Sequence, residues 1–126
     1  MEPLVGVWRL IEARAFDGQE RELPSPLGPQ PMGVAVITDA RIMAVGGDGR
    51  MVLPPAIKRA FAAYSGEYTF DGTTLVTHVD AASDADILED QVRNVRFDGP
   101  RRMIVVPVSR LFGKGGGLEL VWERCG

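Results

Sequence analysis

The sequence is a succession of short runs rich in β-branched and aromatic residues, separated by glycine, proline and aspartate. Eight such runs lie between Leu4 and Arg124, and most of the connections are too short to hold a crossover helix. Neighbouring runs are therefore expected to pair as antiparallel strands. The expected strands are Leu4–Ala15, Gly33–Thr38, Arg41–Val45, Gly66–Phe70, Thr74–Ala81, Gln91–Phe97, Met103–Ser109 and Leu118–Arg124.

One segment, Pro54–Tyr64, departs from this pattern and predicts a helix. Its apolar residues recur at the spacing of one helical face, and they are Ile57, Ala60, Phe61 and Tyr64. The prolines suit the first turn of a helix, and Gly66 suits a position just past its end. We expect one short amphipathic helix near residues 54–64, which either plugs the core or lines a ligand entrance.

The length of 126 residues is enough for one domain, residues 1–126, with its own apolar core. Eight antiparallel strands with one short helix either close into a barrel or split into two packed sheets. Closure removes the exposed edges that invite aggregation. The expected fold is therefore an all-β, eight-stranded, up-and-down antiparallel barrel, whose interior is wide enough for side chains or one small ligand.

Charge and cysteine content argue against several classes of function. Fourteen Lys and Arg against seventeen Asp and Glu give a net charge of −3, which does not favour nucleic-acid binding. A single Cys125 and a single His78 supply neither an internal disulfide nor the usual zinc ligands, and no cofactor or metal is expected. The sequence shows no signal-peptide pattern and no apolar membrane span, so we expect a cytoplasmic protein.

The first and last expected strands carry the residues of a known signature. Gly6-Val7-Trp8 is similar to the G-x-W motif of lipocalins, and Leu120–Arg124 (LVWER) ends in a basic residue. With Pro26–Gly33 (PLGPQPMG) and Asp90–Arg93 (DQVR), the chain resembles the small bacterial lipocalin-like domain family. The resemblance implies a calycin-type barrel with a central cavity. It also implies that Gly6 and Trp8 close one end of the barrel, with Arg124 packed over the indole.

Aromatic residues and methionines occur where a cavity would lie. We expect the ligand-binding residues to be Met43, Phe61, Tyr64, Tyr68, His78, Arg93 and Trp122. Methionine adapts to irregular ligands, whereas tyrosine and tryptophan add a polar group that can orient one. The same residues would equally form a filled core.

His78 is the candidate acid–base residue, because histidine titrates near neutral pH and Asp80 lies on the same face of its strand. However, the more apolar face of this strand, which includes Leu75 and Thr77, is the natural inward one. A surface or structural histidine therefore remains an alternative to a ligand contact or a catalytic base.

Arg93 shares a strand face with Gln91, Val95 and Phe97, and the last two favour the core. An inward arginine needs a partner, because an unpaired buried charge costs several kcal/mol. The candidate partners are Glu67, Glu119 or a carboxylate of the ligand.

These observations favour a binding protein that holds one small, mostly apolar or amphipathic molecule inside the barrel. Two alternatives remain. One is an enzyme of isomerase, cyclase or dehydratase type that uses His78, and the other is a structural or interaction domain whose barrel is filled by its own side chains. A homodimer is also open.

Overall fold

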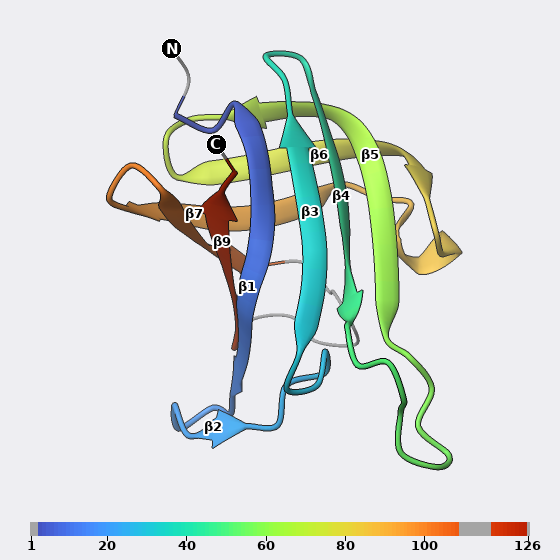
Figure 1. Cartoon of the computed structure of the whole chain (residues 1–126). Coiled ribbons are helices and arrows are strands. Elements are labelled where there is room, and N and C mark those ends of the chain that lie inside the picture. Colours follow the sequence, from blue (N-terminus) through green and yellow to red (C-terminus); the bar gives the residue numbers. More distant parts are fainter. Residues whose placement is uncertain (1–2, 109–116, 126) are drawn as a thin grey trace.

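The computed structural model describes residues 3–108 and 117–125. Within that part of the chain, antiparallel strands form one sheet in the order β2-β1-β3-β4-β5-β6-β7-β8-β9. The sheet closes because β1 also pairs with β9 (Figure 1). The long strands are β1 (Gly6–Phe16), β3 (Pro31–Ile37), β4 (Arg41–Asp48), β5 (Phe61–Phe70), β6 (Thr74–Ala82), β7 (Gln91–Asp98), β8 (Arg102–Pro107) and β9 (Leu118–Arg124).

These eight strands confirm the predicted closed antiparallel barrel. Strand β2 (Glu22–Leu23) is a short addition that pairs with the end of β1 through Ala15 and Phe16. Ser109, the last residue of one expected strand, lies outside the described residues. No helix in the described ranges is long and apolar enough to cross a membrane.

The interior is built by strand alternation. In β3, Ala35 and Ile37 are buried, whereas Val34 and Val36 are exposed on the outside. A bulge between Leu10 and Glu12 reverses this phase in β1, since one extra residue moves the following side chains to the other face. Trp8 and Leu10 therefore face inward before the bulge, and Ala15 is buried after it.

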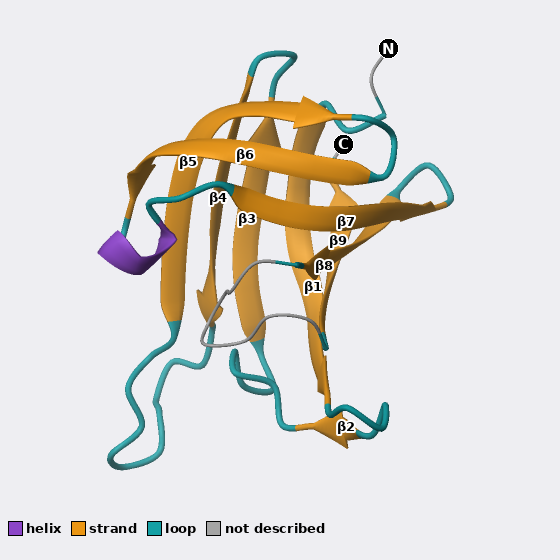
Figure 2. Cartoon of the chain, turned by 180° about the vertical axis from the view of Figure 1, so that it is seen from behind, coloured by secondary structure: helices purple, strands orange, loops and turns teal. Residues whose placement is uncertain are grey.

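The predicted helix near residues 54–64 is wrong. Residues 61–64 begin β5, which pairs with β4 from Gly47↔Phe61 to Arg41↔Glu67, and residues before them form a loop. Ala56 has a φ of 67°, which a right-handed helix does not allow. Ile57 is 52% exposed, so the expected helical face does not exist. Figure 2 shows this loop extending beyond the end of the barrel.

Gly66 lies inside β5 rather than at a helix end. A bulge in β6 places Ala81 opposite Ser65 and Val79 opposite Gly66, so that Asp80 is the extra residue. A Cβ at Gly66 would overlap the carbonyl oxygen of His78. The bulge therefore requires glycine here. The described helical structure consists of one 3-10 turn, η1 (Ala85–Ile87), between β6 and β7.

Candidate functional site

One end of the barrel is closed by a tryptophan and an arginine from the two seam strands. Trp8 is fully buried, and its indole N–H donates to the carbonyl oxygen of Leu4 at 2.9 Å. The Arg124 guanidinium carbon lies 4.2 Å from the centre of a Trp8 ring, which is a close cation–π contact. This pair joins the first long strand to the last one.

Arg124 also ties the N-terminal segment to the barrel. Its guanidinium donates to the carbonyl oxygen of Val5 at 2.7 Å and to that of Pro3. Gly6 permits this approach, because its φ is 144° and a Cβ would lie 2.5 Å from Arg124 Nη1. Gly6, Trp8 and Arg124 thus form one structural unit at the end of the barrel where β1 begins and β9 ends (Figure 1).

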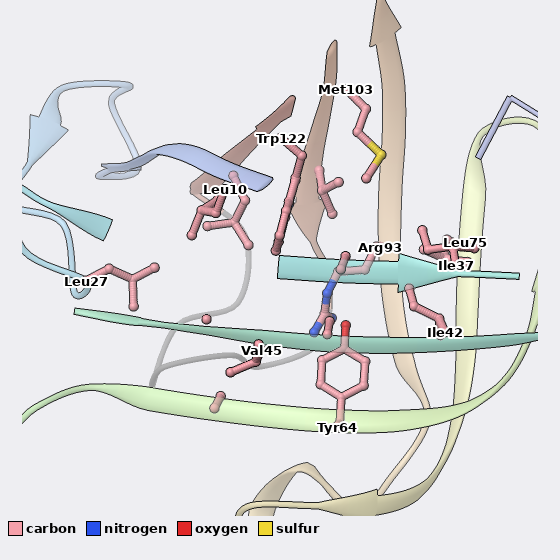
Figure 3. A pocket seen from close by; sticks show the side chains of 16 residues that line it. Leu10, Leu27, Ile37, Ile42, Val45, Tyr64, Leu75, Arg93, Met103 and Trp122 are labelled. Atoms are coloured by element: carbon pink, nitrogen blue, oxygen red, sulfur yellow. The ribbon is translucent and has the colours of Figure 1, made fainter. Parts of the chain in front are cut away.

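The barrel lumen holds a small apolar cavity (Figure 3). Its volume is about 50 Å³, measured as the space open to the centres of water molecules. On that scale one water needs roughly 10–15 Å³, so the cavity has room for a molecule of about three to five non-hydrogen atoms. The described lining residues are Leu10, Leu27, Ala35, Ile37, Ile42, Ala44, Val45, Gly46, Ala62, Tyr64, Leu75, Arg93, Met103, Val105, Leu120 and Trp122.

Arg93 brings a buried positive charge to this lining. It is 2% exposed, and Figure 3 shows its side chain next to the hydroxyl end of Tyr64. The guanidinium carbon lies 5.8 Å from the centre of the Tyr64 ring. Its N–H groups donate to Gln91 Oε1 at 2.9 Å and to the carbonyl oxygen of Val92 at 3.1 Å. The inward position considered for Arg93 is therefore the one observed.

Two further buried polar residues lie beside Arg93 on β6 and β7. Gln91 is fully buried, and its amide N–H₂ donates to the carbonyl oxygens of Ile87 and Glu89. Thr77 is opposite Gln91 in the β6–β7 pairing and is also fully buried. Within the described structure, its hydroxyl oxygen has no hydrogen-bond partner. Thr77, Gln91 and Arg93 are thus buried polar neighbours on β6 and β7, and of these three Arg93 lines the cavity.

The proline-rich loop between β2 and β3 places the side chain of Leu27 in the cavity. Leu27 is fully buried and lines the cavity with Leu10. The next residue, Gly28, has a φ of 72°, and a Cβ there would lie 2.7 Å from Asp48 Oδ2. Glycine at this position therefore lets the loop lie against the end of β4 and holds Leu27 in the lumen.

Asp48 is the anchor against which this loop packs. It is 2% exposed and forms an ion pair with Arg50 at 2.6 Å. Arg59 donates to the carbonyl oxygens of Asp48 and Arg50, each at 2.6 Å. The hydrogen bonds from Arg50 hold the pKa of the Asp48 carboxyl below its ordinary value. Asp48 is thus ionised at neutral pH although it is buried.

The expected ligand-binding residues separate into two groups. Tyr64, Arg93 and Trp122 come together in the cavity lining. Met43 and Phe61 are 61% and 47% exposed on the outer face, which corrects their expected position in the lumen. The reason is strand phase, because their neighbours Ala44 and Ala62 are the residues that face inward.

Tyr68 lies beyond the cavity lining. It is half-buried on β5, and its hydroxyl donates to the carbonyl oxygen of Thr38 at 2.6 Å. This bond ties β5 to the turn between β3 and β4. The position of Tyr68 is thus explained by the fold, apart from any ligand.

His78 lies outside the lumen, which corrects its expected place among the ligand contacts. Its side chain is 52% exposed, and Nδ1 lies 3.1 Å from Asp90 Oδ1. Asp80 forms an ion pair with Arg41 at 2.6 Å instead of orienting the histidine. The described cavity lining contains no histidine, carboxylate or thiol.

The suggested carboxylate partners of Arg93 lie elsewhere. Glu67 is exposed on the outside of β5, and Glu119 is half-buried on β9. Sequence reasoning did not identify Leu27 as a cavity-lining residue, nor Thr77 and Gln91 as the buried polar neighbours of Arg93. Strand alternation did place Thr77 and Gln91 on inward faces, and this alternation is the sequence pattern from which their burial could be predicted. In the described ranges, no cluster of three or more His, Cys, Asp or Glu residues is arranged to hold a metal.

Comparison of the sequence with protein-family models gave no match, and comparison with curated proteins gave none.

Proposed function

We propose that the protein is a lipocalin-like binding protein that holds one small, mostly apolar molecule in its barrel lumen. The observation that carries the proposal is the combination of a closed barrel, an apolar cavity and one buried arginine in the cavity wall. Gly6, Trp8 and Arg124, joined at one end of the barrel, support the lipocalin-like assignment.

The cavity limits the size and polarity of the ligand. Its volume of about 50 Å³ suits a compact molecule of only a few non-hydrogen atoms. Removing the apolar part from water stabilises the complex by roughly 0.8 kcal/mol per CH₂ group. A hydrogen-bond-accepting end of the ligand faces Arg93 and Tyr64, because a guanidinium only donates.

The proposal is tested with a homologous series of short n-alkanols and n-alkanoic acids, followed by tryptophan fluorescence and by the rise in Tm on binding. Trp122 lines the cavity and reports occupancy. We expect affinity to rise with chain length until the cavity is full and then to fall. A signal that grows without a maximum would indicate non-specific association and would contradict a site confined to the lumen.

Two neighbouring alanines provide a matched pair of variants. Ala62 lines the cavity, whereas Ala63 follows it on the outer face of β5. The substitution Ala62→Leu fills the lumen and is expected to abolish binding of the series. Ala63→Leu adds the same atoms outside the lumen and is expected to leave binding unchanged. Equal binding by both variants would locate the ligand elsewhere.

A barrel filled by its own side chains is the second candidate, and the small volume of the cavity favours it. Under this alternative, neither the alkanols nor the alkanoic acids would bind, and Ala62→Leu would change stability alone. Acid–base catalysis by His78 has no such support, since that side chain lies outside the lumen.

A further inference from the structure

The outer face of β1, β3, β4 and β5 carries an unusual concentration of exposed apolar side chains. Eleven large apolar side chains of the described structure are exposed, and six of them lie on this face. These six, which we call the apolar face, are Val7, Met32, Val34, Val36, Met43 and Phe61. Each of them is between 40% and 61% exposed.

Strand register makes the apolar face continuous. Val36 is paired with Val7 on one side and with Met43 on the other. Two residues along the strand, Val34 lies next to Val36 on the same face. Gly47 separates Met32 from Phe61, since it is paired with both and has no side chain of its own. The six side chains therefore form a single surface across four strands.

The size of the apolar face exceeds what isolated exposed residues would give. At the observed exposures, the six side chains present on the order of 500 Å² of apolar surface, which is at the upper end of the largest patches on monomers. When two such faces meet, they bury on the order of 1,000 Å² before their polar borders are counted, which reaches the lower bound for a specific interface.

The charges around the apolar face favour a protein partner over a polyanion. Arg9 at one border lies 3.6 Å from Glu123, and Arg41 at another lies 2.6 Å from Asp80. Each border thus carries both signs, and the chain as a whole has a net charge of −3. Anionic lipid and nucleic acid select a net positive surface instead.

We propose that the apolar face is the interface of a homodimer, with a second copy of this chain as the occupant. A second copy supplies a sheet face of the same shape with the same β-branched side chains, and such faces pack about 10 Å apart. A two-fold interface uses the same patch on both subunits, so the apolar side chains of one copy meet those of the other. The mixed borders meet borders of the same composition.

Sedimentation equilibrium of the full chain tests the proposal. As the protein concentration rises to about 100 μM, the weight-average mass should rise from 13.7 kDa toward twice that value. A mass of 13.7 kDa at every concentration would overturn the proposal.

Single substitutions then locate the interface. Val36→Glu is expected to raise the dimer Kd by about 100-fold or more, because dimerisation would bury an unpaired carboxylate from each copy. Asn94→Glu adds the same charge to an exposed outer position of β7 and should leave the Kd unchanged. Circular dichroism confirms that both variants are folded. If the two variants had the same Kd, the dimer would use another surface.

Methionine oxidation by dilute peroxide gives a second measurement on the unaltered protein. Met43 lies in the apolar face, whereas Met51 is 95% exposed in the β4–β5 loop. Oxidation of Met43 should slow at least fivefold, relative to Met51, as the dimer forms. If the ratio of the Met43 oxidation rate to the Met51 oxidation rate were the same at all protein concentrations, the proposed interface would be contradicted. A protein that stays monomeric and cosediments with phosphatidylcholine vesicles would also overturn it, since lipid would then be the occupant.

Discussion

At the scale of single residues, Arg93 sets the chemistry of the lumen. The guanidinium stays charged, so its burial needs hydrogen-bond acceptors around it. Gln91 and the Val92 carbonyl supply two acceptors, and the ring of Tyr64 faces the cation. Under the proposed function, the same group would make the lumen selective, because a ligand with an acceptor at one end would gain an interaction that a plain hydrocarbon lacks.

Replacing Arg93 tests this selectivity. In Arg93→Met, the affinity for an n-alkanoic acid relative to the n-alkanol of equal length should fall by about tenfold or more, since a charge-assisted hydrogen bond contributes about 1.5–3 kcal/mol. Calorimetric titration of both compounds measures the ratio. His78→Ala, outside the lumen, serves as the control and should keep the wild-type ratio. An unchanged ratio in Arg93→Met would place the polar end of the ligand elsewhere.

Trp8 is the side chain that closes one end of the barrel. Trp8→Ala should lower the free energy of unfolding by roughly 3–5 kcal/mol, because it removes a fully buried aromatic side chain and the surface on which Arg124 packs. Urea denaturation measures the loss. Trp8→Phe retains a ring and should lose clearly less. A loss of a few tenths of a kcal/mol in the alanine variant would show that the end-closing contact contributes little.

At the scale of elements, the bulge in β6 and the glycine opposite it depend on each other. Gly66→Ala should lower the free energy of unfolding by about 1–3 kcal/mol, since the added methyl overlaps the His78 carbonyl and forces backbone movement. The matched control is Gly18→Ala, where a Cβ would have no neighbour within 4 Å. Thermal unfolding of both variants checks this. If Gly18→Ala lost as much stability as Gly66→Ala, the loss would not come from the overlap with the β6 bulge.

The junction of β4 with the Leu27 loop predicts a specific response to acid. The hydrogen bonds from Arg50 lower the pKa of Asp48 below its ordinary value of 3.8 in the folded protein. The folded state therefore favours the ionised carboxyl, and this stabilisation is present above pH 3.8 and is lost as the pH falls through the lowered pKa.

Asp48→Asn should therefore make the decrease in Tm below about pH 4 shallower than in the wild type. At neutral pH the variant should be less stable, because Arg50 loses its anionic partner. Differential scanning calorimetry at several pH values measures both effects. If the plots of Tm against pH had the same shape for the two proteins, Asp48 would not contribute to the acid response.

The segment at residues 54–64 shows where sequence patterns are ambiguous at this scale. Ala60 to Tyr64 is almost wholly apolar, so the same residues fit a helical face and an alternating strand. The strand is formed because β4 provides hydrogen-bond partners from Arg41 to Gly47, a long-range effect that local spacing does not contain. Ala56 has a positive φ in the loop before β5. Alanine has no preference for this conformation, so the residue type does not predict the loop.

At the scale of the whole molecule, the barrel was predictable because turn residues and short connections leave few antiparallel arrangements. The β1–β9 pairing confirms the expected closure. Which side chains line the lumen was only partly predictable. Alternation predicts that Arg93 and Trp122 face inward only if the inward face of each strand is known. Bulges such as that after Leu10 change which residues of a strand face inward. The cavity volume depends on the packing of many side chains and was beyond sequence reasoning.

Binding inside the closed barrel is tested most directly by methyl NMR during a titration with 1-butanol. Methyl groups of Leu10, Ile37 and Leu120 line the cavity, whereas those of Val7, Val34 and Val36 lie outside. We predict saturable shifts of the lining methyls, with contacts from the alcohol to them, and constant positions for the outer ones. Unmoved lining methyls, or shifts confined to the outer valines, would contradict a ligand-binding lumen.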